Sequence, residues 1–327
     1  MRVIELDFKN DIDYQMIENF FRAEWEFKHE SGVFNYKLNV QKDKILPGPH
    51  RFYVQLNPDR IAKRRGPEAI KSVTESFNPE SFNFTKVADD EILLKIETKT
   101  FERVTLLINN SPLTEFHTLI CPNLEKCLPQ RLNLKGLEFA ASLLMNFNDT
   151  SYRIGYNSPL ALASVNHFHM HLLCIPSKTF YVETMKLVPL CEKREFYRTP
   201  DAETIKGFCF RITNSAEITP KCIDACKLVD YLCDHGIAHN ALITYERVAT
   251  AGVLRLFVWP REKPRMNKNL APFNVGFCEL AGYVTLGNEE LFETHTEESI
   301  SKFICDELGN GITEKMTTDL LEIFNKS

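Results

Sequence analysis

The stretch GYNSPLALASVNHFHMHLLCIP, residues 155–176, decides how this chain of 327 residues is organised. Within it, His167, His169 and His171 alternate with apolar residues, and an apolar run follows. Side chains on a β-strand point alternately to the two faces of the sheet. The alternation therefore predicts a strand from residue 167 to residue 175, with three imidazoles on one face and apolar anchors on the other.

Two chemistries could use this row of histidines, a metal site or a covalent nucleophile. At a rise of roughly 3.3 Å per residue the outer histidines start about 13 Å apart, whereas the ligand nitrogens of a tetrahedral zinc lie about 2.1 Å from the metal. The spacing therefore disfavours a metal and makes His169 a covalent nucleophile, flanked by His167 and His171 as donors to a phosphoryl group. A sheet face without chemistry is the third interpretation, and the cost of burying three imidazoles disfavours it.

The composition is that of a soluble globular protein, with 44% hydrophobic and 25% charged residues. No apolar run approaches the roughly 18 residues that span a bilayer, and the first residues, MRVIELDFKNDIDYQ, lack the apolar region of a secretory signal. We therefore expect a cytoplasmic protein with no membrane partner. Ten cysteines scattered through a long chain favour free thiols over a disulfide framework.

The charge balance bears on the class of ligand. A net charge of −5 and a pI of about 6.0 create no overall basic field that would attract polymeric nucleic acid. A nucleotide needs only local positive charge, and Lys63, Arg64 and Arg65 form a basic cluster shortly after a turn at Asn57 and Pro58. A solvated surface is the alternative interpretation of this cluster.

A short aromatic segment suggests a place for a base. Phe82 and Phe84 flank Asn83, so the two rings share one face of an extended segment while the amide offers paired donor and acceptor groups. Guanine recognition would use such groups. An aromatic pair in the core is an equal alternative.

Five sequence blocks carry a resemblance to a known family. They are QLNPDRIAKRRGPEAIKSV (55–73), FNFTKV (82–87), LASVNHFHMH (162–171), DYLCDHGIAHN (230–240) and FNVGFCELAGY (273–283). Together they resemble the family of GDP-D-glucose and GDP-L-galactose phosphorylases, within the histidine-triad superfamily and its H-x-H-x-H signature. The resemblance implies that a guanylyl group passes through the middle histidine, His169.

The resemblance also implies further site residues. Ser164 holds the place of a Ser or Thr that contacts a phosphoryl oxygen, and Asn109 and His117 match a turn, N-x-x-P-x-x-x-x-H, that lines the nucleotide pocket. Many superfamily members have glycine just before that histidine, whereas this chain has Phe116.

Other polar residues near the signature are candidates for substrate contacts. Asn157 and Asn166 are the amides among them, and Gly155 suits a bent loop that brings backbone N–H groups to an anion. From the family resemblance, Arg64 and Arg65 are expected to face the diphosphate or the incoming phosphate.

The expected fold class is α+β, an antiparallel histidine-triad-like sheet with packed helices. Weak repetition and a resemblance to galactose-1-phosphate uridylyltransferases imply two such halves, of which only the first is catalytic. The expected divisions are an N-terminal helical extension (1–50), the catalytic half (51–176), an irregular connecting segment (177–215) and a degenerate second half (216–327).

The expected function is phosphorolysis of GDP-D-glucose to GDP and glucose 1-phosphate through a guanylylated His169. The expected partners are GDP-D-glucose and inorganic phosphate, with no cofactor and no metal, in a monomer or weak homodimer. Hydrolysis of a nucleoside diphosphate-sugar or a dinucleotide is the first alternative. It arises because superfamily hydrolases carry histidine at the position of His171, where uridylyltransferases and plant phosphorylases carry glutamine. A non-catalytic nucleotide-binding protein is the second alternative.

Overall fold

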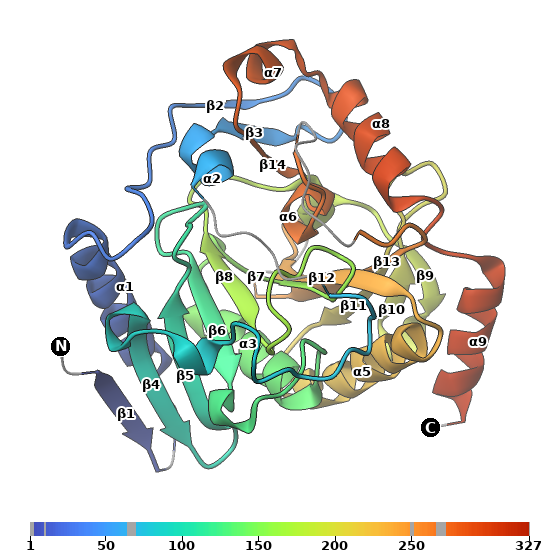
Figure 1. Cartoon of the computed structure of the whole chain (residues 1–327). Coiled ribbons are helices and arrows are strands. Elements are labelled where there is room, and N and C mark those ends of the chain that lie inside the picture. Colours follow the sequence, from blue (N-terminus) through green and yellow to red (C-terminus); the bar gives the residue numbers. More distant parts are fainter. Residues whose placement is uncertain (1–2, 10, 64–69, 249–251, 266–272, 327) are drawn as a thin grey trace.

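A computed structural model describes residues 3–9, 11–63, 70–248, 252–265 and 273–326. Eleven strands form one sheet in the order β1-β4-β5-β6-β8-β7-β12-β13-β11-β10-β9 (Figure 1). The strands are β1 (Ile4–Phe8), β4 (Ile92–Thr98), β5 (Glu102–Ile108), β6 (Thr118–Pro122), β7 (Tyr152–Asn157), β8 (Met170–Cys174), β9 (Val188–Cys191), β10 (Phe196–Arg198), β11 (Phe208–Ile212), β12 (Ala238–Tyr245) and β13 (Leu254–Arg261). All neighbouring pairs are antiparallel except β1 with β4. The expected α+β fold with an antiparallel sheet is confirmed.

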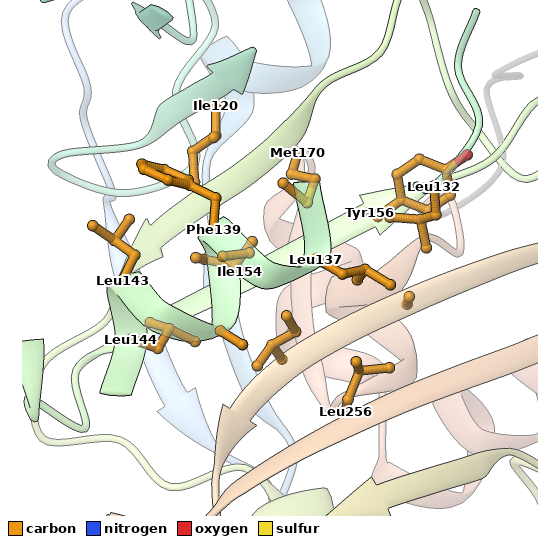
Figure 2. Packing of buried hydrophobic residues seen from close by; sticks show 14 of the residues in the cluster. Ile120, Leu132, Leu137, Phe139, Leu143, Leu144, Ile154, Tyr156, Met170 and Leu256 are labelled. Atoms are coloured by element: carbon orange, nitrogen blue, oxygen red, sulfur yellow. The ribbon is translucent and has the colours of Figure 1, made fainter. Parts of the chain in front are cut away.

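Helices cover one face of the sheet. These are α1 (Tyr14–Glu30), α3 (Leu134–Phe147), α5 (Ile218–Asp234) and α9 (Glu314–Asn325), whose apolar residues join those of the strands in one large cluster. Figure 2 shows part of this cluster, in which Phe139 and Leu144 of α3 lie among strand residues such as Ile154 and Met170. Each of α1 and α3 begins at an Asp or Asn side chain that accepts from a backbone N–H of the first turn.

The other face carries a second layer. A small sheet in the order β14-β3-β2 is built from β2 (Lys42–Ile45), β3 (Tyr53–Leu56) and β14 (Tyr283–Leu286). Nearby are the helices α2 (Pro58–Ala62), α4 (Tyr181–Thr184), α6 (Phe277–Leu280), α7 (Glu289–Thr294) and α8 (Glu297–Leu308). Because β3 and β14 are parallel neighbours, the small sheet joins the first third of the chain to its last quarter.

The histidine strand is shorter than predicted. β8 begins at Met170, and the residues before it are held by a side chain instead of a neighbouring strand. The Gln130 amide accepts a hydrogen bond from His169 N at 2.9 Å and donates to His169 O at 3.1 Å. The Gln130 side chain therefore forms the two backbone hydrogen bonds that a neighbouring strand would otherwise form with His169.

The predicted alternation nevertheless holds. Phe168, Met170 and Leu172 belong to the cluster on the helical face, whereas His169 and His171 line a cavity on the opposite side. Residues 168–172 therefore alternate between the two faces of the sheet, including the two residues that precede β8.

Two predicted divisions contain more sheet than expected. Residues 1–50, expected to be helical, include β1 and β2, and residues 177–215, expected to be irregular, include β9, β10 and β11. β9 and β10 have four and three residues and lie at one end of the sheet, so they show little of the alternation that marks a longer strand.

Two expectations from composition can be compared with the structure. All ten cysteines lie in the described part of the chain and all are free thiols, as predicted. Among the described residues, no helix is long and apolar enough to cross a membrane.

A partly buried histidine, His50, contacts two glutamates in the second layer and makes the stability of the fold depend on pH. His50 Nε2 lies 2.8 Å from Glu203 and Nδ1 lies 3.0 Å from Glu297 of α8. The hydrogen bond to Glu203, reinforced by Glu297, raises the pKa of His50 above its ordinary value. A raised folded-state pKa stabilises the fold fully below the unfolded-state pKa of about 6.5, and this contribution is lost as the pH rises through the folded-state pKa.

We therefore expect His50→Gln to lower the free energy of unfolding by about 0.5–1 kcal/mol near pH 6, because the partly exposed pair is screened by solvent. Near pH 9 the loss should shrink, since neutral His50 no longer forms a charged pair. Urea unfolding of both proteins at the two pH values measures this. An equal loss at both pH values would contradict the account.

Candidate active site

The candidate active site is a cavity of about 610 Å³ on the face of the sheet opposite α3. Its floor comes from β8 and the ends of β5, β6 and β7, and its walls come from α2, α6 and two short 3₁₀ turns, η1 (Phe84–Lys86) and η2 (Asp89–Glu91). Its volume lies within the range of small-molecule sites, about 300–1,000 Å³. Residues far apart in the sequence therefore meet around one space.

His169 is oriented by the backbone. It is 3% exposed, and its Nδ1 lies 2.8 Å from the carbonyl oxygen of His167. A carbonyl only accepts, so Nδ1 carries the proton and the lone pair of the neutral ring lies on Nε2. The Gln130 amide fixes both backbone groups of the same residue. The ring is thus prepared in the tautomer that a nucleophilic Nε2 requires.

His167 lies behind the cavity and outside its lining. Its Nδ1 accepts from Phe84 N at 3.1 Å, and its Nε2 donates to Leu124 O at 3.0 Å. Burial lowers its pKa, so the ring stays neutral and keeps these two opposite roles. Both ring nitrogens therefore contact the backbone of neighbouring turns, and the place of His167 beside the phosphoryl group stays a prediction.

His117 connects the cavity wall to His171. Its Nδ1 accepts from Leu113 N at 3.0 Å, and its Nε2 lies 3.1 Å from His171 Nδ1. Burial, together with the positive charge of Arg60, holds the pKa of His117 well below its ordinary value. The side-chain nitrogen of Asn109 also lies 3.0 Å from His117 Nε2, so this ring nitrogen faces both Asn109 and His171.

The amides of the predicted set occupy different places. The Asn109 side chain lies 3.0 Å from His117 Nε2 and lines the cavity, as does Asn157 at the end of β7. Asn166 lies outside the lining, because its amide donates to Glu75 O and Ser76 O and accepts from the loop before α3. These contacts tie three backbone segments together, and the substrate contact of Asn166 stays a prediction.

Gly155 lies inside β7 and not in a bent loop, which corrects the role expected for it. It is paired with His171 across the strands, and a Cβ atom at this position would lie 2.0 Å from the Phe277 ring. The absent side chain lets Phe277 pack against His171, with ring centroids 5.5 Å apart. Glycine is therefore needed at this position so that the Phe277 ring can approach β7 closely.

Of the predicted basic cluster Lys63, Arg64 and Arg65, the structure describes Lys63. Arg64 and Arg65 lie outside the described residues, so their predicted role stays a prediction. Arg60 and Lys63 of the same segment line the cavity. Arg60 also donates to the backbone oxygen of Ser111, which joins α2 to the loop after β5.

Of the predicted site residues, six line the cavity: Asn109, His117, Asn157, Ser164, His169 and His171. The lining also includes residues from the second half of the chain, namely Asn274, Gly276, Phe277, Cys278, Glu279 and Thr285. The predicted catalytic half therefore does not enclose the site alone. The block FNVGFCELAGY, one of the five that carry the family resemblance, was a signal for this contribution, whereas Gln130 stands in a loop without any pattern.

Among the residues that the structure describes, no group of three or more His, Cys, Asp or Glu side chains is arranged to hold a metal ion. The Cys222, Cys226 and Cys233 thiols lie along α5, and burial raises the pKa of each one. These thiols are packed as core or near-core residues of a helix.

Comparison with known proteins bears on this site. A family model described as GDPGP1-like, N-terminal domain, matches residues 16–173. GDP-D-glucose phosphorylase 1 of Danio rerio is 32% identical over 292 residues, which cover 86% of this chain and 84% of the relative. The protein of the same name from Homo sapiens is 33% identical over 298 residues, covering 86% of this chain and 77% of the relative.

A solved structure shares the fold. The crystal structure of yeast Ap4A phosphorylase Apa2 superposes with a TM-score of 0.60 at 17% identity, covering 90% of this chain and 98% of that chain. At this identity the likeness concerns the fold alone.

Proposed function

Because this chain belongs to the family of GDP-D-glucose phosphorylases, we propose that it catalyses the phosphorolysis of GDP-D-glucose to GDP and glucose 1-phosphate. The proposal rests on one observation above all. His169 lines the cavity, with its Nδ1 proton bound by the His167 carbonyl and its lone pair on Nε2. A covalent nucleophile needs this arrangement.

In the first step, His169 Nε2 attacks the α-phosphorus of GDP-glucose. An N–P bond forms while the bond from that phosphorus to the bridging oxygen breaks, and glucose 1-phosphate leaves with the oxygen and the bonding electrons. The guanylylated imidazole is cationic. The His167 carbonyl stabilises it, since hydrogen bonds to charged donors are stronger than those to neutral ones.

In the second step, an oxygen of inorganic phosphate attacks the same phosphorus. The N–P bond breaks, GDP leaves, and His169 recovers its lone pair. Dividing one displacement into two in this way is the contribution of a covalent nucleophile. Both steps pass through similar charge distributions, so the same donors can serve each of them.

The donors are cavity residues. The His171 ring and the Ser164 hydroxyl are suited to donate to the non-bridging oxygens of the transferred phosphoryl group. Arg60 and Lys63 supply positive charge for the diphosphate and for the incoming phosphate. Arg64 and Arg65 follow these two cations in the sequence and belong to the same proposal.

The acceptor decides between phosphorolysis and hydrolysis, because His171 stands where superfamily hydrolases carry histidine. We expect incubation with GDP-glucose and phosphate to yield GDP, since held phosphate gains effective concentration over water. Chromatographic identification of the guanine nucleotide measures this. GMP formed equally with and without phosphate would mean hydrolysis, and an unchanged substrate would mean a binding protein.

We further infer that the reaction takes place in the cytoplasm, where ten free thiols remain reduced. GDP-glucose and phosphate are the small-molecule partners that the cavity would receive. Comparing the rates of phosphorolysis of GDP-glucose and of nucleotide sugars with other hexoses would identify the preferred sugar.

A further inference from the structure

A carboxylate lines a cavity that would receive a polyanion. Glu91, at the end of η2, is one of the lining residues. Its Oε2 accepts from Asn110 Nδ2 at 3.1 Å and its Oε1 accepts from Ala88 N at 3.4 Å. In the described part of the chain no Lys, Arg or His forms an ion pair with it. A ligand group that meets Glu91 should therefore bring hydrogen-bond donors and no negative charge.

The position of Glu91 indicates which end of the ligand it meets. A row of rings crosses the site from Phe82 and Phe84 to His169, His171 and Phe277, with centroid separations of 6.0, 5.0, 5.1 and 5.5 Å. Phe84 belongs to a small apolar cluster. The phosphate chemistry at the two histidines thus lies between an apolar end at Phe84 and a second end at Phe277.

Glu91 lies at the apolar end. The next residue, Ile92, is a member of the same cluster as Phe84, together with Leu107 and Val165, and it pairs with Leu107 across the strands. Val87 packs against this cluster from the turn that leads to Glu91. The end of the cavity at Phe84 thus combines apolar side chains with the Glu91 carboxylate, which is suited to a flat base whose edge carries donors.

Guanine matches this requirement better than the other common bases. Its Watson–Crick edge presents two adjacent donors, N1–H and the 2-amino group, which the two oxygens of one carboxylate can accept side by side. Adenine presents an acceptor at N1, which a carboxylate would repel. A carboxylate has about four lone-pair sites, and Asn110 and Ala88 use only two of those on Glu91.

We propose that Glu91 selects guanine by accepting hydrogen bonds from N1–H and the 2-amino group of the base. This proposal rests on the proposed function, because it takes the ligand to be a guanine nucleotide sugar. Asn110 positions the carboxylate, since its amide donates to Glu91 while its oxygen accepts from Asn35 N at 2.8 Å.

Asn83, the residue whose amide first suggested guanine recognition, is used elsewhere. Its oxygen accepts from Thr85 N at 3.1 Å and from the Thr85 hydroxyl at 2.6 Å, and its nitrogen donates to Ser81 O at 3.2 Å. It is 2% exposed. Asn83 therefore starts the η1 turn and places Phe84, while Glu91 reads the base.

The test compares Glu91→Gln with the wild type on GDP-glucose and on IDP-glucose, whose base lacks the 2-amino group. One hydrogen bond to a charged group corresponds to about 10- to 100-fold in affinity, so we expect the wild type to prefer GDP-glucose by this factor in kcat/KM. In Glu91→Gln the KM for GDP-glucose should rise by roughly 100-fold with little change in kcat. The preference over IDP-glucose should fall to within about 3-fold of unity.

The ratio between the two substrates separates base recognition from a structural role. If Glu91 only supported η2 or bound the ribose, its loss would lower kcat/KM for both substrates alike and the preference would persist, which would overturn the proposal. Asp90→Asn is the matched control, because Asp90 is the exposed neighbouring carboxylate outside the cavity. This variant should keep the wild-type ratio.

Calorimetric binding of GDP and IDP distinguishes failure of this inference from failure of the proposed function. A wild-type protein that degrades no nucleotide sugar, yet binds GDP more tightly than IDP through Glu91, would contradict only the proposed reaction. If Glu91→Gln is poorly folded, Glu91→Asp keeps the charge on a shorter side chain and should retain part of the preference. Equal binding of GDP and IDP by the wild type would refute the role of Glu91.

Discussion

Exchanging His169 for Asn should lower kcat by about 10⁴-fold or more, the scale seen when a covalent nucleophile is removed. Asparagine keeps a polar group of similar size, so the backbone bonds to Gln130 can persist, but it has no nitrogen lone pair that can attack phosphorus. Steady-state assays with GDP-glucose and phosphate measure the loss. GDP binding should change little, because the contacts proposed for the base and the diphosphate come from other residues.

His235→Asn is the control for this experiment. His235 is exposed just after α5 and lies outside the cavity lining, so its exchange should leave kcat within about 2-fold of the wild type, as for surface positions away from the site. A His169→Asn protein that kept more than about a tenth of the wild-type kcat would show that another group is the nucleophile.

The largest effect on stability is expected at Arg153. Its guanidinium on β7 and the Glu183 carboxylate of α4 are both completely buried, with Nε and Oε1 2.7 Å apart. Glu183 also accepts from Thr244 of β12 and from Phe180 N. One carboxylate therefore joins the segment after β8 to two strands at the centre of the sheet.

Arg153→Met should lower the free energy of unfolding by about 3–5 kcal/mol, because it leaves the Glu183 charge buried without its main partner. Urea unfolding at neutral pH measures the change. Asp306→Asn is the control, since its pair with Lys302 is exposed and should contribute less than about 0.5 kcal/mol. The double variant Arg153→Met/Glu183→Leu should be more stable than Arg153→Met. A loss below about 1 kcal/mol in the single variant would contradict the argument.

Elements with their own periodicity could be predicted from the sequence. The apolar spacing in residues 134–147 gives α3, and the alternation around His169 places the histidines and Met170 on opposite sides. Both patterns are local, so they can be recognised without knowledge of the rest of the chain. The turn residues NSPLTE (110–115) between two apolar runs likewise predict the hairpin of β5 and β6.

Features that depend on distant contacts could not be predicted. Gln130 binds the backbone of His169, 39 residues later, and nothing in its loop indicates this. In the basic segment, Asn57 accepts from Arg60 N and begins α2, and this places Arg60 at the cavity. β1 lies parallel to β4, which is more than 80 residues away, so its position follows from tertiary pairing and not from its own pattern.

The most direct test of the central claim, a guanylyl intermediate on His169, is a burst experiment without phosphate. Enzyme incubated with GDP-glucose alone should release glucose 1-phosphate once per active site and then stall, because water is not held for the second step. Adding phosphate should then discharge the bound guanylyl group as GDP and restart turnover. Continued release of glucose 1-phosphate together with GMP, or no burst at all, would contradict the account.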